Sequence, residues 1–69
     1  MSRIRILAIE RLFINKKQIT MGEIKTELQN VYGIESERKA IYKDIEALQH
    51  FIHIEKKKVE KTYVYTLRE

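Results

Sequence analysis

The sequence predicts a small α+β domain, mainly helical, in which three helices precede a β-hairpin. Apolar residues recur with helical spacing through about the first 50 residues, and from about residue 52 they alternate with polar residues as in strands. The chain has 69 residues, no proline and only two glycines, which leaves little room for long irregular loops. We therefore expect a single domain, 1–69, without a linker or an internal repeat.

The first predicted helix runs from about Arg3 to Ile14 and is apolar on two sides. One broad face is expected to enter the core and comprises Ile6, Ala8, Ile9, Leu12 and Phe13. A second apolar stripe, Ile4, Leu7 and Ile14, needs a cover of its own, which a second subunit would supply in a homodimer. Alternatively, Ile4 and Ile14 lie at frayed helix ends against the hairpin. The sequence leaves both interpretations open.

The second predicted helix begins after Thr20 and ends at Gly33. The connector before it, Lys16 to Ile19, has room for one short strand. Thr20-Met21-Gly22-Glu23 matches a capping box, and glycine adopts the left-handed conformation that ends a helix without steric cost. The stripe expected to be buried is Ile24, Leu28 and Val31.

The third predicted helix runs from Ser36 to His50, with Ser36 as its N-cap. Its buried stripe is expected to be Ile41, Ile45 and Leu48. The opposite face carries Arg38, Lys39, Tyr42, Lys43 and Glu46. Two helices of about three turns, joined by a short turn that contains glycine, form a helix-turn-helix.

The predicted hairpin completes a winged helix-turn-helix, with the hairpin as the wing. Its inward positions are expected to be Ile52, Ile54, Tyr63, Tyr65 and Leu67. The segment from Lys56 to Lys61 is expected to connect the strands as a flexible cationic arm that suits phosphates, through Lys56, Lys57, Lys58 and Lys61. An edge strand protected from aggregation by lysine would have the same composition.

The sequence contains no pattern typical of an enzyme. It has no cysteine and no glycine-rich phosphate loop, and His50 and His53 are not joined by acidic residues at metal-ligand spacing. We therefore expect no catalysis, no cofactor, no metal and no small-molecule pocket. No apolar run approaches the roughly 20 residues of a membrane span. Together with the absence of cysteine, this favours a cytoplasmic location without membrane association.

The charge pattern favours double-stranded DNA as the partner. The net charge is +4, and a helix N-terminus adds a partial positive charge. Helix-turn-helix proteins insert this end of the third helix, here within about residues 37–50, into the major groove. The expected DNA-binding residues are Ser36, Arg38, Lys39, Tyr42, Lys43, Lys56, Lys57, Lys58 and Lys61. A solvated charged face is the alternative, because Glu37 and Glu46 leave the helix neutral overall.

The segment Ser36–Leu48, which reads SERKAIYKDIEAL, resembles part of a known family. It is similar to the recognition-helix segment in the N-terminal winged helix-turn-helix of bacterial WYL-domain transcriptional regulators, often grouped with DeoR-type repressors. Tyr32-Gly33-Ile34 and the run from Arg5 to Ile9 are also similar to that domain. The resemblance implies that Arg38, Lys39, Tyr42 and Lys43 face DNA.

Two positions depart from the family pattern. Ala40 replaces a hydroxyl residue and Lys43 replaces an arginine, which removes one polar contact and one bidentate fork. The 69 residues also contain no effector-binding WYL domain. This leaves open an excised domain or a stand-alone regulator of the kind that phages and mobile elements encode.

The sequence thus favours a sequence-specific transcriptional regulator that binds double-stranded DNA as a homodimer through Ile4, Leu7 and Ile14. One alternative is a protein-interaction module on the same scaffold, such as a phage-encoded inhibitor. The basic charge argues against a DNA mimic, which should be acidic. A second alternative is an excisionase-like protein that bends DNA.

Overall fold

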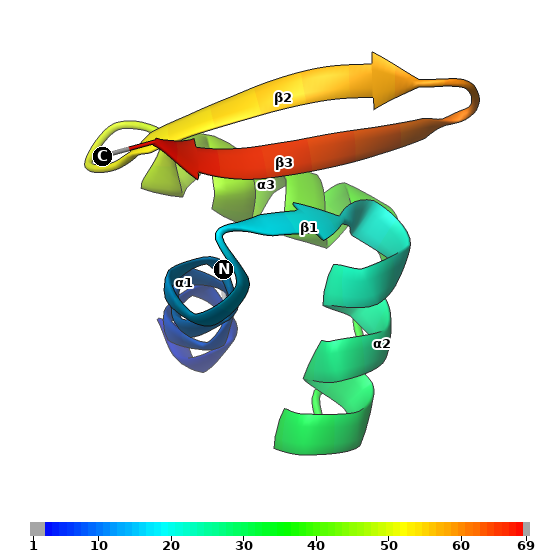
Figure 1. Cartoon of the computed structure of the whole chain (residues 1–69). Coiled ribbons are helices and arrows are strands. Elements are labelled where there is room, and N and C mark those ends of the chain that lie inside the picture. The colour runs from blue at the N-terminus through cyan, green and yellow to red at the C-terminus, as the bar shows by residue number, and fades with distance from the viewer. Residues whose placement is uncertain (1–2, 69) are drawn as a thin grey trace.

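The computed structural model describes residues 3–68 and confirms an α+β fold with a winged-helix layout (Figure 1). It contains three helices and one three-stranded antiparallel sheet. In chain order the elements are α1 (Arg3–Lys16), β1 (Gln18–Thr20), α2 (Met21–Tyr32), α3 (Arg38–Leu48), β2 (His53–Val59) and β3 (Thr62–Arg68). The connector between the first two helices therefore does supply a short third strand.

The sheet has the strand order β1-β3-β2, so the short first strand lies beside the last. β1 pairs with residues 64–66 of β3, whereas β2 pairs with β3 along the whole length of both strands. Because β1 connects α1 to α2, this pairing attaches the hairpin to the helices. The hairpin turn projects beyond the body of the molecule, as Figure 1 shows.

One hydrophobic core lies between the helices and the sheet. Its buried members from α1 are those predicted, Ala8, Ile9, Leu12 and Phe13, with Ile6 half-buried at the edge. α3 contributes the predicted stripe Ile41, Ile45 and Leu48. The rings of Phe13 and Tyr65 meet edge to face, with centroids 6.2 Å apart and planes at 85°. This favourable aromatic geometry joins α1 to β3.

The second helix has the predicted caps at both ends. The Glu23 N–H donates to the Thr20 hydroxyl oxygen (3.1 Å), and the Thr20 N–H donates to a Glu23 carboxylate oxygen (3.0 Å), which completes the capping box. Gly33 ends the helix in the left-handed conformation, at φ 66°. Ile24 and Leu28 are buried, but the prediction for Val31 is wrong, because its side chain is 62% exposed. The last turn of α2 points away from the sheet and leaves the core (Figure 1).

The third helix is shorter than predicted and lacks the predicted cap. It begins at Arg38, and its N-cap residue is Glu37, whose side chain makes no capping hydrogen bond. Residues 33–37 are not helical, so the N-cap position falls on Glu37, one residue after the predicted cap Ser36. The Ser36 hydroxyl is instead buried without a hydrogen-bond partner among residues 3–68. After Leu48 a turn leads into β2.

The hairpin strands extend further into the lysine-rich segment than predicted. Lys56, Lys57 and Lys58 lie within β2 and pair with Tyr65, Val64 and Tyr63. The turn contains only Glu60 and Lys61, with Glu60 in the left-handed conformation (φ 57°) that two-residue hairpin turns use. The prediction of a flexible arm is therefore wrong for three of its four lysines, because strand pairing orders their backbone.

The capping box predicts acid-sensitive stability. The Thr20 N–H, and secondarily the Thr20 hydroxyl, stabilise the Glu23 carboxylate and lower the pKa of Glu23 below its ordinary value of 4.5. Because the charged form is favoured in the folded state, this stabilisation is present above pH 4.5 and is lost as the pH falls through the lower folded-state pKa. We expect Glu23→Gln to weaken the acid dependence of urea unfolding.

Glu35→Gln is the matched control, because Glu35 is exposed and lies outside the helices. It should keep the acid dependence of the wild type. If Glu23→Gln loses stability between pH 5 and pH 2 as steeply as the wild type, the capping box does not account for the effect.

Candidate nucleic-acid interface

Three exposed cations lie on the first half of α3. The side chains of Arg38, Lys39 and Lys43 are exposed, and none of them forms an ion pair with another residue in the range 3–68. The first turn of α3 also has no acidic residue and no side-chain cap, so its amides keep their partial positive charge. These three side chains and the helix N-terminus together form a surface that favours an anionic partner.

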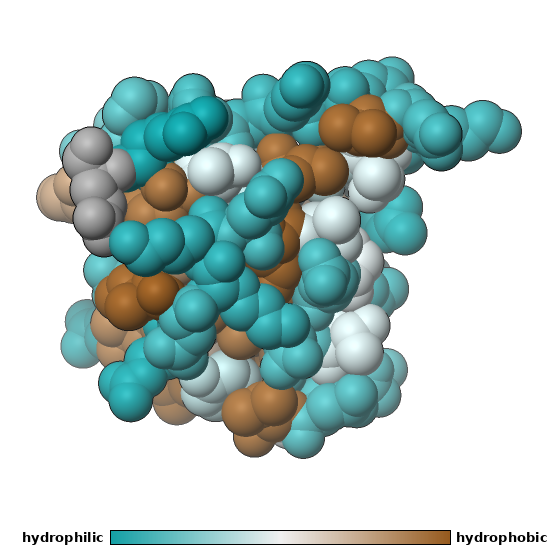
Figure 2. Space-filling view, viewed as in Figure 1, coloured by the Kyte–Doolittle hydropathy of each residue, from teal (hydrophilic) through white to brown (hydrophobic). Residues whose placement is uncertain are grey.

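The hairpin turn lies on the same side of the molecule as this surface. In Figure 1, α3 begins on the side where β2 turns into β3 and ends on the opposite side. Lys61, which is in the turn, is therefore on the side on which Arg38 begins the helix. The projecting tip is hydrophilic in the space-filling view of Figure 2.

The four hairpin lysines do not form one cluster, although all are exposed. Side chains alternate along β2, so Lys56 and Lys58 share the sheet face of buried Ile54, whereas Lys57 lies on the other face. The Lys56 ammonium lies 4.8 Å from the centroid of the Tyr63 ring, a cation–π contact. The structure thus brings Lys56 next to α3 and leaves the other three on the outer half of the hairpin.

Tyr42 is half-buried rather than free on the outer face of α3. Its ring meets that of Tyr63 edge to face, with centroids 6.1 Å apart and planes at 87°. The contact links α3 to β3 and holds the hairpin beside the helix. Ser36, the remaining predicted contact residue, has a buried hydroxyl, which is therefore not part of the exposed cationic surface.

An ion pair that sequence analysis missed joins α1 to α3. Asp44 of α3 is fully buried, and Arg5 of α1 binds it twice: the Arg5 Nε donates to Oδ2, and Nη2 donates to Oδ1 at 3.4 Å. The hydrogen bonds from its own side chain to Asp44 raise the pKa of Arg5, so the guanidinium stays charged. A sequence signal existed: Asp44 lies between Ile41 and Ile45 on the inner side of the helix, where a carboxylate needs a cation.

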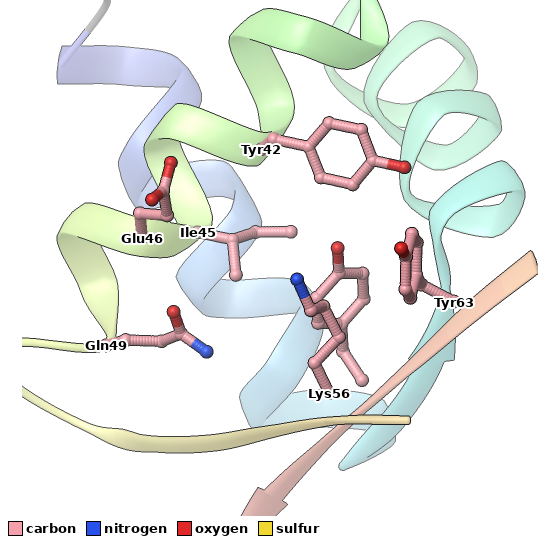
Figure 3. Close-up of a pocket in the computed structure, with 7 residues that line it drawn as sticks. Tyr42, Ile45, Glu46, Gln49, Lys56 and Tyr63 are labelled. Atoms are coloured by element: carbon pink, nitrogen blue, oxygen red, sulfur yellow. The ribbon is translucent and has the colours of Figure 1, made fainter. Parts of the chain in front are cut away.

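A cavity of about 410 Å³ lies between α3 and the hairpin, although no pocket was expected from the sequence (Figure 3). Its lining comprises Tyr42, Ile45, Glu46 and Gln49 from α3 and Lys56, Tyr63 and Tyr65 from the hairpin. These residues approach one another only when the hairpin packs against the helix. No local sequence pattern marks such a site.

The second apolar stripe of α1 is uncovered. Ile4, Leu7 and Ile14 are 71%, 57% and 56% exposed. The alternative that Ile4 and Ile14 pack against the hairpin is therefore wrong. Figure 2 shows separate hydrophobic patches among hydrophilic surface on the face in view.

In the range 3–68, no group of three or more His, Asp or Glu side chains is placed to hold a metal ion. No helix in the same range is long and apolar enough to cross a membrane. No protein-family model, no curated protein and no solved structure matches the chain.

Removing one partner of the buried ion pair should destabilise the fold strongly. We expect Arg5→Met to lower the free energy of unfolding by about 3 kcal/mol, because it leaves the Asp44 carboxylate buried and unpaired. The double variant Arg5→Met/Asp44→Leu should recover most of that loss, because it buries no charge. Urea unfolding followed by circular dichroism measures both.

Arg3→Met is the control, since Arg3 is exposed on the same helix, and it should unfold within about 0.5 kcal/mol of the wild type. A double variant no more stable than Arg5→Met would show that the cost is lost packing of the long Arg5 side chain rather than an unpaired charge.

Proposed function

We propose that this protein is a sequence-specific transcriptional regulator that binds double-stranded DNA. The observation that carries the proposal is the exposed set Arg38, Lys39 and Lys43 at the uncapped start of α3. On a winged-helix scaffold this end of the helix enters the major groove. In that position Arg38 is suited to donate to a guanine edge, and the two lysines are suited to nearby phosphates.

The hairpin supports the same proposal. Lys57, Lys58 and Lys61 lie on its outer half, and the turn projects on the side where α3 begins (Figure 1). Contacts from these lysines to the flanking backbone would add a salt-sensitive, sequence-independent contribution to affinity. The resemblance of Ser36–Leu48 to WYL-domain regulators assigns DNA contact to Arg38 and its neighbours as well.

A homodimer through α1 is part of the proposal. The stripe Ile4, Leu7 and Ile14 is exposed, and burying it against a second copy would remove apolar surface from water. One small module contacts few base pairs, so two copies are needed for useful affinity. A twofold dimer would read a palindromic site.

A protein-interaction module is the second candidate function. Phe51 is 87% exposed, lies in the turn after α3 and is not one of the α1 residues that a homodimer would cover. A stoichiometric partner recovered by pull-down, without any shift of duplex DNA, would favour this candidate. An excisionase-like role would use the same DNA surface, and a circular-permutation gel assay for bending distinguishes it.

DNA binding is tested by titrating labelled duplex at two salt concentrations, using sites selected from a random pool. We expect Arg38→Ala to weaken binding to the selected site by about 1–3 kcal/mol, because a guanine contact is lost. Lys43→Ala should reduce the slope of log affinity against log salt by about 0.9, because one phosphate contact is lost.

Arg68→Ala is the matched control, because it removes one positive charge at the end of β3 opposite the turn, where Arg68 binds Glu55. It should leave specific affinity unchanged. Absence of duplex binding even at low salt would refute the proposal, and unchanged affinity in both α3 variants would exclude α3 as the reading element.

The dimer is tested by Leu7→Glu, which places a charge in the middle of the exposed stripe. We expect the wild type to sediment as a dimer and the variant as a folded monomer, because Leu7 is 57% exposed and does not support the core. Asn15→Glu, at an exposed polar position of the same helix, should remain dimeric. If Leu7→Glu also remains dimeric, α1 is not the interface.

A further inference from the structure

We propose that the cavity between α3 and the hairpin binds a small planar aromatic molecule that carries one carboxylate. The cavity has a volume of about 410 Å³ and is open to solvent on one side. Its lining combines aromatic rings, an ammonium group and an unused hydroxyl donor, and each of these selects one part of the ligand. The proposal of a ligand site does not depend on the proposed DNA-binding function.

The hydroxyl of Tyr65 is the unused donor. The side chain is 1% exposed and lines the cavity, and its hydroxyl has no hydrogen-bond partner among residues 3–68. Burial raises the pKa of Tyr65, so the hydroxyl keeps its proton and remains a donor. Buried polar groups in folded proteins are nearly always paired. A ligand acceptor at this point would provide the pairing.

Lys56 places a positive charge in the same cavity. Its ammonium lies 4.8 Å from the Tyr63 ring centroid and forms no ion pair within the described chain. In Figure 3 the Lys56 amine points into the cavity beside Ile45, whereas the Glu46 carboxylate points away from the cavity. A ligand carboxylate there would accept charge-assisted hydrogen bonds from Lys56 and a hydrogen bond from Tyr65.

The aromatic walls select a flat ring. Tyr42 and Tyr63 already meet edge to face, with centroids 6.1 Å apart, so a ligand ring would lie against the cavity side of this pair rather than between the two rings. Ile45 adds an apolar wall. A single ammonium balances a monoanion, whereas the second negative charge of a phosphate monoester would have no cation in the lining to balance it. The lining therefore favours a carboxylate.

Occupation of the cavity would affect DNA binding, a consequence that rests on the proposed function. Tyr42 belongs to α3, and Lys56 and Tyr63 belong to the hairpin, so the ligand would bridge the two DNA-facing elements. It would also neutralise Lys56, one of the predicted phosphate contacts. We expect the ligand to weaken DNA binding.

The site is tested first without DNA. Indole-3-carboxylate is titrated into the full chain and followed by calorimetry and by NMR of the tyrosine rings. We expect saturable binding at one site, with shifts at Tyr42, Tyr63 and Tyr65. Indole-3-carboxamide has the same shape without the charge and should bind at least about tenfold more weakly.

Variants then locate the site. Lys56→Met and Tyr65→Phe should each weaken indole-3-carboxylate binding by about tenfold. Tyr65→Phe keeps the ring that packs on Phe13 and removes only the unpaired hydroxyl, so the fold is retained. Lys58→Met, on the same face of β2 but outside the lining, should bind as the wild type does. No saturable binding, equal binding of the carboxamide, or wild-type affinity in both cavity variants would overturn the site.

Duplex titration with and without the ligand tests the regulatory consequence separately. Weaker DNA binding in the presence of indole-3-carboxylate, absent in Tyr65→Phe, supports it. Unchanged DNA affinity at saturating ligand overturns the coupling. Failure to bind duplex at all would refute the proposed function, whereas the DNA-free titration would still decide whether the cavity binds the ligand.

Discussion

The orientation of α3 depends on the buried ion pair between Arg5 and Asp44. The hydrophobic contacts of Ile41 and Ile45 provide much of the stabilisation, but burial of apolar surface has no direction and tolerates small rotations of the helix. A fully buried carboxylate does not tolerate such rotations, because a rotation that separates it from its cation leaves it unpaired, which is very costly. The helix must therefore take the rotation and height at which Asp44 meets the guanidinium. That rotation leaves the neighbouring side chain of Lys43 exposed.

Local sequence patterns were sufficient to predict the elements of the fold. Helical spacing placed all three helices and the switch to alternation placed the hairpin, because both patterns act within a few residues. The caps at Thr20 and Gly33 were predictable for the same reason. The wrong predictions concern residues whose structure depends on contacts with distant parts of the sequence. Val31 continues its stripe in sequence, but α2 has by then left the core, and pairing with β3 extends β2 through lysines that composition assigns to a loop.

The features of the candidate site also fall into two groups: those that local sequence patterns predict and those that depend on distant contacts. Exposure of Arg38, Lys39 and Lys43 follows from their position opposite a buried stripe, so the sequence predicts it. The ion pair spans 39 residues of sequence, and the cavity needs two segments that meet only after folding. Ser36 fails for a different reason. Several polar residues in a row can cap a helix, and the path of the connecting turn decides that Glu37 takes this position.

α1 would connect DNA binding to dimerisation in the proposed regulator. One side of this helix contacts α3, and another side carries the exposed apolar stripe. Arg5 turns inward and fixes α3, while Ile4 and Leu7, within a turn of it, are exposed. In a dimer built on that exposed stripe, each α1 would position its own α3 on one side and the second subunit on the other side. The separation of the two reading helices would then depend on a rigid helix and one directional ion pair, rather than on a flexible linker. Such an arrangement fixes half-site spacing, and hence specificity, through residues that touch no DNA.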